Sequence, residues 1–376
     1  MRRRRLITTF DDLPEGVLGE IFSRVPVRDL LRAKCVSKFW CDVISSRWFI
    51  SMQLNKSFSD PTRNYLLLLR NHELPSAVFC TVQSPNILVE LDEFKKLGTS
   101  CFVVGSINGL VCIACVGLGR WCFLWNPSLR ERRCLPKGSI LARDRKRVQA
   151  TLGFGHEPSS DDYKVVRILN FSPQFADSGM PLTRVEVYSF SLDTWKEIEI
   201  DFPLTITRRS CDVILNGFIY WLAEKGNVNE KAFVASFDMR REVFQQIVVP
   251  DAVIVKSHHY SVMNFRGRLG LLVYGAHFEL QKCLQVWMLE DKRSGVGVWT
   301  KNLMITMDFQ LSYHWGLANG CIVVQNTPNA PFLYDPERKE RKIIGVNGMN
   351  GVFYYVESLV SIKKRRSRKR AIKMLK

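Results

Sequence analysis

The sequence lacks the features that mark a membrane protein or one of the common enzyme classes. No run approaches the roughly 18 consecutive apolar residues that a membrane-spanning helix requires. The arginines at positions 2–5 are followed by no apolar stretch, so we expect no secretory signal. There is no phosphate loop ending in Gly-Lys-Ser/Thr, no His-Glu-x-x-His motif and no Gly-x-Ser-x-Gly turn. We therefore predict a protein without a membrane segment, a cofactor or catalytic residues of its own.

The eleven cysteines and six histidines form no pattern that is typical of a metal site. Cys112 and Cys115 make one Cys-x-x-Cys pair, but the second pair of a zinc ribbon is missing. His258 and His259 are adjacent, and neighbours on a strand face opposite sides. Most cysteines lie in apolar runs, where a thiol behaves as a small buried hydrophobe, so we expect a reducing compartment and no metal. A hydrolase whose cysteine and histidine meet only in the folded chain stays open as an alternative.

Residues 13–49 have the pattern of three short helices. Apolar residues at 14, 17, 18, 21, 22 and 25 follow the spacing of an amphipathic helix that begins near Pro14 and ends before Pro26. A second apolar stripe follows at 30, 31, 35 and 36. Ser37 is placed to cap a third helix that carries Trp40.

This helical module is small and has a weakened first helix. Gly16 and Gly19 each cost that helix roughly 0.5–1 kcal/mol relative to alanine. Three helices in fewer than about 50 residues also enclose little core. We therefore expect the module to bury apolar surface against a partner.

The module resembles the F-box, which binds the adaptor of SCF (Skp–cullin–F-box) ubiquitin ligases. The resemblance rests on the order of Leu-Pro, Val-Pro-Val, Cys-Val-Ser-Lys and a tryptophan at 13–14, 25–27, 35–38 and 40. It implies that an F-box at residues 6–52 docks a Skp-type adaptor and, through it, a cullin. Some apolar residues must instead hold the three helices together, and the sequence does not divide the two roles. The predicted adaptor-binding residues are Leu13, Pro14, Ile21, Phe22, Val27, Leu30, Val36 and Trp40.

From residue 62 to residue 358, short runs of β-branched and aromatic residues alternate with turn signals. Asn-Gly pairs at 108–109, 216–217 and 319–320 lie between apolar runs, which predicts tight hairpins. Arg266-Gly267 occupies an equivalent place. A strand that ends in a polar turn residue recurs at 126, 191, 238, 290 and 335, with spacings of 65, 47, 52 and 45 residues.

These spacings, apart from the first, are close to the length of a four-stranded propeller blade. Packing blades around an axis buries both faces of each sheet and leaves only short edges. We predict a mainly β chain, with an irregular, kelch-like β-propeller of about six units after the helices. Strands near 65–69 and 78–82 would start it, and residues 351–356 would close it. A two-sheet β-sandwich is the alternative.

The β region is similar to the F-box-associated domain that follows the F-box in a large plant family, also described as F-box/kelch-like. The matching segments include GSINGLVC at 105–112, LWNPS at 124–128, LGFG at 152–155 and DDYKVV at 161–166. The resemblance implies a non-catalytic subunit that holds a target protein for ubiquitination and degradation. We expect target contacts in loops at one end of the domain. The candidates are Arg145, Phe171, Phe175 and His259.

Basic charge is concentrated at the two ends of the chain. The formal net charge is +18, of which positions 2–5 supply four and residues 363–376 supply nine, leaving +5 for the rest. We predict a disordered tail at 359–376, which is a nuclear-import signal, an arm that contacts phosphates of nucleic acid, or a solvated end without a role. The import residues would be Lys363, Lys364, Arg365, Arg366, Arg368, Lys369 and Arg370.

Two functions follow from these observations. The first is the substrate-recognition subunit of an SCF ligase, present in the nucleus and the cytoplasm. The alternative is a nuclear β-propeller scaffold that binds nucleic acid or protein through its basic tail.

Overall fold

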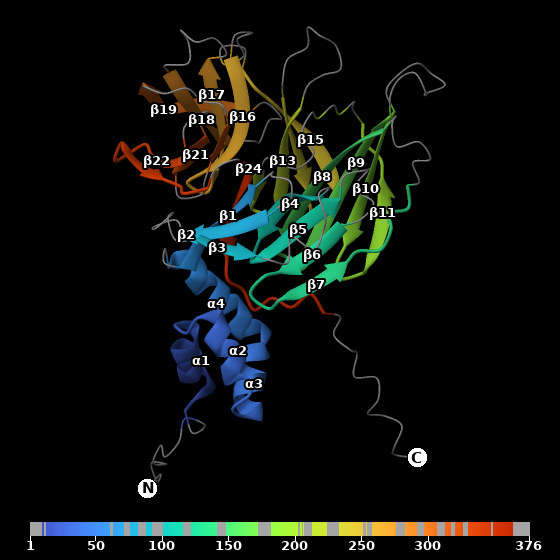
Figure 1. Ribbon diagram of the computed structural model, residues 1–376. Helices are drawn as coiled ribbons and strands as arrows, with labels where there is room; N and C mark the ends of the chain where they lie inside the picture. Colours follow the sequence, from blue (N-terminus) through green and yellow to red (C-terminus); the bar gives the residue numbers. More distant parts are fainter. Residues whose placement is uncertain are drawn as a thin grey trace.

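In the computed structural model of this chain, a small helical module stands against one end of a ring of β-sheets (Figure 1). No helix within the described residues is long and apolar enough to span a bilayer. The structure describes residues 10, 13–60, 63–70, 76–81, 88–91, 101–115, 122–140, 148–171, 182–201, 204, 206, 213–223, 233–250, 253, 258–275, 283–291, 297–306, 313–316, 320–325, 330–346 and 349–363.

The module contains helices α1 (Glu15–Ser23), α2 (Val27–Ala33), α3 (Lys38–Ser45) and α4 (Arg47–Ser59). The first three confirm the sequence prediction, and the Ser37 hydroxyl caps α3 by accepting a hydrogen bond from the backbone N–H of Trp40 at 3.1 Å. The fourth is missing from that prediction and continues beyond the predicted F-box boundary at residue 52. Its signal is present in the sequence, because Ser46 caps it and residues 49, 53, 54 and 57 lie on its buried face.

The strands described by the structure form six four-stranded antiparallel sheets, which we number as blades 1 to 6. Blade 1 contains β24 (Met349–Val356), β1 (Asn64–Arg70), β2 (Ser76–Thr81) and β3 (Leu88–Leu91), and blade 2 contains β4 (Cys101–Ile107), β5 (Leu110–Cys115), β6 (Cys122–Asn126) and β7 (Glu131–Cys134). Blade 3 contains β8 (Val148–Glu157), β9 (Asp162–Phe171), β10 (Leu182–Ser189) and β11 (Thr194–Ile198), and blade 4 contains β12 (Val213–Leu215), β13 (Phe218–Ala223), β14 (Phe233–Asp238) and β15 (Val243–Val248). Blade 5 contains β16 (His258–Phe265), β17 (Arg268–Gly275), β18 (Cys283–Asp291) and β19 (Val298–Thr306), and blade 6 contains β20 (Tyr313–Gly316), β21 (Ile322–Gln325), β22 (Phe332–Asp335) and β23 (Glu340–Ile343).

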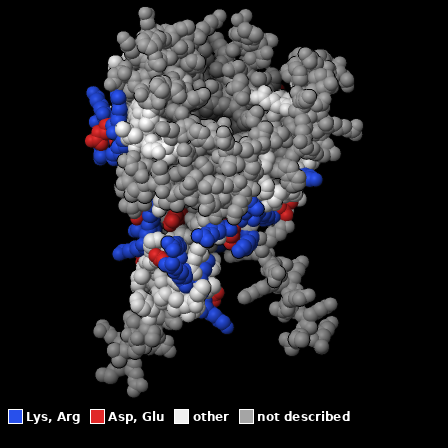
Figure 2. All heavy atoms as spheres, viewed as in Figure 1, with Lys and Arg blue, Asp and Glu red and all other residues white. Residues whose placement is uncertain are grey.

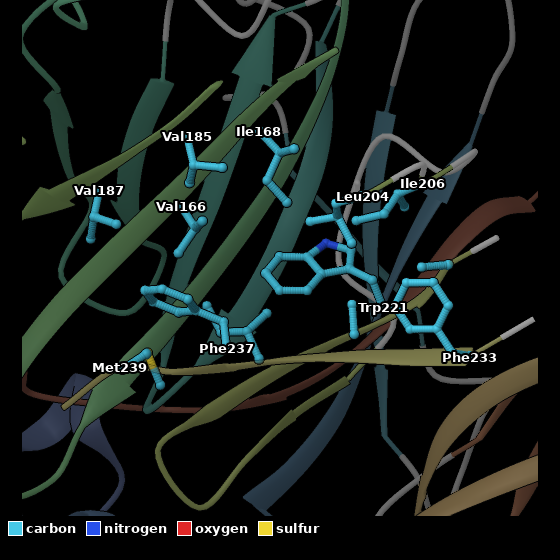
Figure 3. Packing of buried hydrophobic residues seen from close by; sticks show 13 residues of the cluster. Val166, Ile168, Val185, Val187, Leu204, Ile206, Trp221, Phe233, Phe237 and Met239 are labelled. Carbon is cyan, nitrogen blue, oxygen red and sulfur yellow. The ribbon is translucent and has the colours of Figure 1, made fainter. Parts of the chain in front are cut away.

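One buried apolar cluster lies at each contact between neighbouring blades. The clusters join blades 1 and 2, 2 and 3, 3 and 4, 4 and 5, 5 and 6, and finally 6 and 1. In the cluster between blades 3 and 4, Trp221 of β13 has Val166 and Phe237 on one side and Phe233 on the other (Figure 3), and its indole N–H donates to the Leu152 carbonyl at 3.4 Å. A closed ring of six interfaces confirms the propeller and excludes a two-sheet sandwich, which has a single interior.

The two ends of the β region interlock in blade 1. The last strand, β24, pairs antiparallel with β1, and Leu66 lies opposite Tyr354. This pairing confirms that the predicted first and last strands start and close the domain. Strands from both ends of the domain therefore share one blade, and this pairing closes the ring.

The hairpin turns and the long connections lie at opposite ends of the propeller. Gly109, in the first Asn-Gly turn, approaches Ser358, while Gly217 approaches Pro158 and Gly320 approaches Arg266, so these turns gather at the helical end. Positive φ angles of 52° at Arg266 and 75° at Gly267 confirm the predicted equivalence of that turn. The strand ends that flank residues 141–147, 172–181 and 276–282 point away from the helices.

One predicted turn residue is displaced by two positions. The turn residues Asn126, Asp238 and Asp335 are each followed, four positions later, by a residue with a positive φ. In blade 3 the residue with a positive φ is Asp193, so the equivalent turn residue is Ser189 and not Ser191. The Asp162 carboxylate accepts from the Ser189 hydroxyl at 2.6 Å and from the Ser191 backbone N–H at 2.8 Å. The Ser189 hydroxyl also accepts from the Leu192 backbone N–H at 3.2 Å, so Ser189 and Asp162 together fill the role that one Asn or Asp has in the other turns.

Candidate protein-interaction surfaces

Helix α1 divides its apolar residues between two faces. Leu18 and Phe22 are 0% and 5% exposed and lie in the core of the module, whereas Val17 and Ile21 are 46% and 39% exposed. Each pair is four residues apart, so each forms its own stripe along the helix. Pro14, immediately before the first turn, is also exposed. Helix α1 therefore presents an apolar stripe to solvent.

The eight predicted adaptor-binding residues fall into two groups. Phe22, Val27 and Leu30 are at most 5% exposed and form the core of the module, so we no longer expect them to contact a partner. A buried side chain cannot reach a partner while it holds its own helices together. The other five keep some exposure and stay in the prediction: Leu13, Pro14, Ile21, Val36 and Trp40.

Five further exposed apolar residues of the module are absent from the sequence prediction. They are Phe10, Val17, Phe39, Trp48 and Phe58, which are 58%, 46%, 36%, 41% and 42% exposed. Of the 13 large apolar side chains that are exposed in the described part of the chain, seven belong to residues 10–58. Such a concentration in so small a unit is typical of a surface that binds another protein. The spacing of Pro14, Val17 and Ile21 was the signal that could have identified the stripe on α1.

A close contact between α1 and α4 fixes the shape of the module. A side-chain Cβ on Gly19 would lie 2.8 Å from Cζ3 of Trp48, so the first helix can approach the fourth only because this residue is glycine. The Trp48 indole N–H donates to Glu15 Oε1 at 3.1 Å across the same contact. Gly16, in contrast, faces open space.

The two predicted target-binding residues that the structure describes, Phe171 and His259, lie at the end of the propeller that faces away from the helices. Phe171 ends β9, where it pairs with Val148 and Leu182 and is half-buried. His259 lies in β16, in a non-adjacent blade, and its side chain is outside the described residues, as are Arg145 and Phe175. The structure therefore places the two described positions at a common end but does not bring them together.

The most deeply buried charges have a structural role. Arg167 and Glu186, on paired strands β9 and β10, are 2% and 0% exposed and form an ion pair. Glu186 also accepts hydrogen bonds from the Ser139 hydroxyl at 2.9 Å and from the Ile140 backbone N–H at 3.0 Å. The pair therefore anchors the connection between blades 2 and 3.

Two thiols of blade 2, Cys101 and Cys122, are poorly suited to nucleophilic chemistry. Burial raises the pKa of Cys101 and of Cys122 to about 12, so both remain protonated near neutral pH. Cys101 lies opposite Cys115 on paired strands, with 2.8 Å between the sulfur atoms. Within the described ranges, no three His, Cys, Asp or Glu side chains are grouped as a metal site would require.

Comparisons with known proteins agree with this architecture. The family model described as the F-box associated beta propeller domain matches residues 65–355, and the F-box domain model matches residues 10–51. An F-box protein of Arabidopsis thaliana is 28% identical over 326 residues, which cover 82% of both chains. An F-box/kelch-repeat protein of the same species is 25% identical over 357 residues, covering 92% of this chain and 90% of its own. The chain therefore belongs to the plant F-box proteins that carry an F-box associated β-propeller.

Proposed function

We propose that this chain is the substrate-recognition subunit of an SCF-type ubiquitin ligase. F-box proteins are in general non-catalytic subunits whose F-box binds a Skp-type adaptor and whose second domain recognises a substrate. In this chain, the F-box would bind the adaptor and the propeller would hold a target protein for ubiquitination and proteasomal degradation. The observation that carries the proposal is the exposed apolar stripe on α1, which the F-box does not use for its own core.

The physical argument for adaptor binding is the burial of apolar area. Fully burying a Val or Ile side chain is worth roughly 1.5–3 kcal/mol before the costs of association. Val17, Ile21 and Val36 retain 39–66% of their exposure in the isolated chain, so a partner can still remove this surface from water. A few such contacts are sufficient for a specific complex.

The propeller would act by proximity. Its long connections leave from the end opposite the F-box, so a target bound there is held by the same molecule that is anchored to the ligase core. Holding a target in this way raises its effective concentration near the conjugating enzyme without acid–base chemistry in this chain.

A pair of matched valine substitutions tests the adaptor-binding surface. Val17→Asp places a charge on the α1 stripe, and Val248→Asp places one on the outer strand of blade 4; the two valines are 46% and 47% exposed. We expect Val17→Asp to weaken binding of a purified Skp-type adaptor at least about tenfold, or 1.4 kcal/mol, and Val248→Asp to leave it unchanged. Equal binding by both variants, or no binding by the wild-type chain, would contradict the proposal.

The same point variant can identify the target. Deleting the F-box would expose propeller residues that pack against it, such as Leu129, whereas Val17→Asp changes an exposed residue and should weaken adaptor binding without disturbing the fold. Proximity labelling with this variant should enrich proteins that become more abundant in cells when the wild-type chain is absent. A labelled set that does not change in abundance would count against a degradation role.

We also propose that the basic run from Lys363 to Arg370 directs nuclear import, with the protein shared between nucleus and cytoplasm. Lys363 is exposed and lies 3.2 Å from Glu131 at the junction of the F-box and blade 2. Figure 2 shows Lys and Arg side chains gathered at this junction, where Arg28 and Arg132 are exposed. A fluorescent fusion that lacks residues 364–376 should lose its nuclear fraction. If the full chain instead binds RNA, and both added salt and this truncation abolish the binding, the result would favour the nuclear scaffold alternative.

A further inference from the structure

Residues Glu357–Lys363, which follow the last strand, form a strap between the F-box and blade 2. The strap is the red segment that passes below β7 and beside the helices in Figure 1. Leu359 and Ile362 are each 1% exposed, so the prediction of a disordered tail from residue 359 is wrong for these first residues. We refer to residues 357–363 as the C-terminal strap.

The strap completes the core of the F-box. Leu359 belongs to the same buried cluster as Leu18, Phe22 and Leu30. Glu357 accepts a hydrogen bond from the backbone N–H of Val27, at the first turn of α2. A carboxylate at this place satisfies a helix N–H that has no partner within the helix. The F-box therefore receives both an apolar side chain and a helix cap from the far end of the sequence.

The strap is also bonded to blade 2. The buried side chain of Asn126 donates from Nδ2 to the carbonyls of Ser358 at 3.1 Å and Val360 at 2.7 Å. Glu131 Oε2 accepts from the Ser361 hydroxyl at 2.8 Å and from the Ile362 backbone N–H at 3.0 Å. Four hydrogen bonds from two side chains therefore hold the strap against the propeller.

Neighbouring residues of the strap face different domains. Leu359 enters the F-box core, whereas Val360 and Ile362 pack on the apolar cluster between blades 2 and 3. In an extended segment, successive side chains point to opposite sides, so one short segment can join two cores. Neither domain can move away from the other without exposing one of these residues.

The direct link between the two domains is short and has one further anchor. Four residues separate α4 from β1. Among them, the Arg63 guanidinium donates to the carbonyl of Ser23 at 2.8 Å and to that of Arg24, at the end of α1. A flexible link of four residues spreads over about 10 Å, so without the strap only the Arg63 contacts and the packing of Leu129 would restrict the movement of the F-box.

We propose that the C-terminal strap is a positioning segment that fixes the orientation of the F-box relative to the target-binding end of the propeller. This inference rests on the proposed function, because a fixed orientation presents particular lysines to an enzyme bound through the F-box. Ubiquitin transfer by proximity depends on the distance and orientation of the acceptor lysine. The strap is therefore required for efficient transfer, and the α1 stripe alone supports adaptor binding.

The test measures the orientation directly in the full chain. Spin labels on unnatural amino acids at exposed Glu20 of α1 and exposed Arg240 of blade 4 avoid the eleven native cysteines. Leu359→Asp breaks the F-box side of the strap, and Val360→Asp with Ile362→Asp breaks the propeller side. The control is Met304→Asp, since Met304 is 62% exposed and lies on the outer strand of blade 5, whereas the strap is bonded to blade 2.

We expect one narrow distance in the wild-type chain and in the control. Both strap variants should broaden the distribution toward the spread of about 10 Å that the linker permits. The propeller-side variant leaves the F-box core intact, so its result stands if Leu359→Asp unfolds the F-box. Narrow distributions in both strap variants would overturn the inference and leave the proposed function untouched. Failure of the wild-type chain to bind the adaptor would overturn the proposed function, while the distances still decide the role of the strap.

Autoubiquitination gives a functional readout without an identified target. In a reconstituted adaptor–cullin complex, mass spectrometry can map which lysines of this chain are modified. We expect a restricted set in the wild-type chain and a wider set in the propeller-side strap variant, because a pivoting propeller presents more lysines. An unchanged set in a variant with a broadened distance would contradict the link between orientation and transfer.

Discussion

The propeller and the F-box obtain their stability in different ways. The propeller closes its ring with six apolar clusters built almost entirely from its own strands, whereas the F-box core includes Leu359 from the C-terminal strap and is covered by Leu129 of blade 2. The F-box also leaves seven large apolar side chains exposed. The larger domain is therefore self-sufficient, and the smaller one depends on surfaces that other parts of the chain or a partner supply.

This difference predicts an asymmetric response to core truncation, which is the largest effect that we expect. Trp221→Ala removes the largest fully buried side chain of the propeller (Figure 3) and should destabilise that domain by about 3–5 kcal/mol. Because the propeller carries the strap, its unfolding should also lower the thermal stability of the F-box. Calorimetry together with adaptor binding measured against temperature would follow the two domains separately.

Phe49→Ala is the matched change in the F-box. Phe49 is 0% exposed, and its truncation should cost the F-box about 3–5 kcal/mol and abolish adaptor binding. The thermal transition of the propeller should persist at nearly the wild-type temperature. If each truncation lowered both transitions equally, the chain would be one cooperative unit and the comparison would be wrong.

Acid should weaken the propeller through Glu157. Burial raises the pKa of this carboxyl, but hydrogen bonds from Ser159 and Ser160 outweigh burial and lower the pKa to about 2. The carboxylate therefore stabilises the turn above its unfolded pKa of about 4.3, and this contribution is lost as the pH falls toward 2. Glu157→Gln should destabilise the propeller by about 1.5–3 kcal/mol at pH 7. Urea unfolding of both proteins at pH 7 and at pH 3 would measure this difference, and we expect it to be smaller at pH 3.

The stability of the junction between the F-box and the propeller should change with pH in the opposite direction. Burial raises the pKa of Glu357 above its usual value, against the lowering effects of the Val27 N–H and of Arg63. A raised pKa in the folded state contributes stability below the unfolded pKa, and that contribution is lost as the pH rises through the folded value. Glu357→Gln should remove this dependence from F-box docking and leave the acid response of the propeller unchanged. Identical pH profiles for the F-box transition in the two proteins would contradict this assignment.

Local pattern predicted the strands and turns because each depends on neighbours in the sequence. The Asn-Gly turns, the cap at Ser37 and the pairing of the first with the last strand all follow from spacing and turn chemistry. The sequence did not show which apolar F-box residues are buried in its core and which are exposed. Ile21 and Phe22 are both apolar, and only the packing of α3 and α4 decides which one is buried. The strap was missed because LVSIK precedes a dense basic run, and its two docking sites belong to distant parts of the chain.

The smallest expected effects come from the two glycines of α1, which the sequence treats alike. Gly19→Ala should destabilise the F-box by about 1–3 kcal/mol, because the new methyl group must displace the Trp48 ring. Gly16→Ala meets no neighbour and should stabilise the isolated F-box by about 0.5–1 kcal/mol through helix propensity alone. Both changes should leave the propeller transition unmoved in thermal unfolding. Opposite signs would show that glycine at position 19 stabilises the module by allowing the contact with Trp48, whereas glycine at position 16 only lowers the helix propensity of an open surface. Equal effects at the two positions would mean that helix propensity, and not the contact with α4, sets the stability of the module.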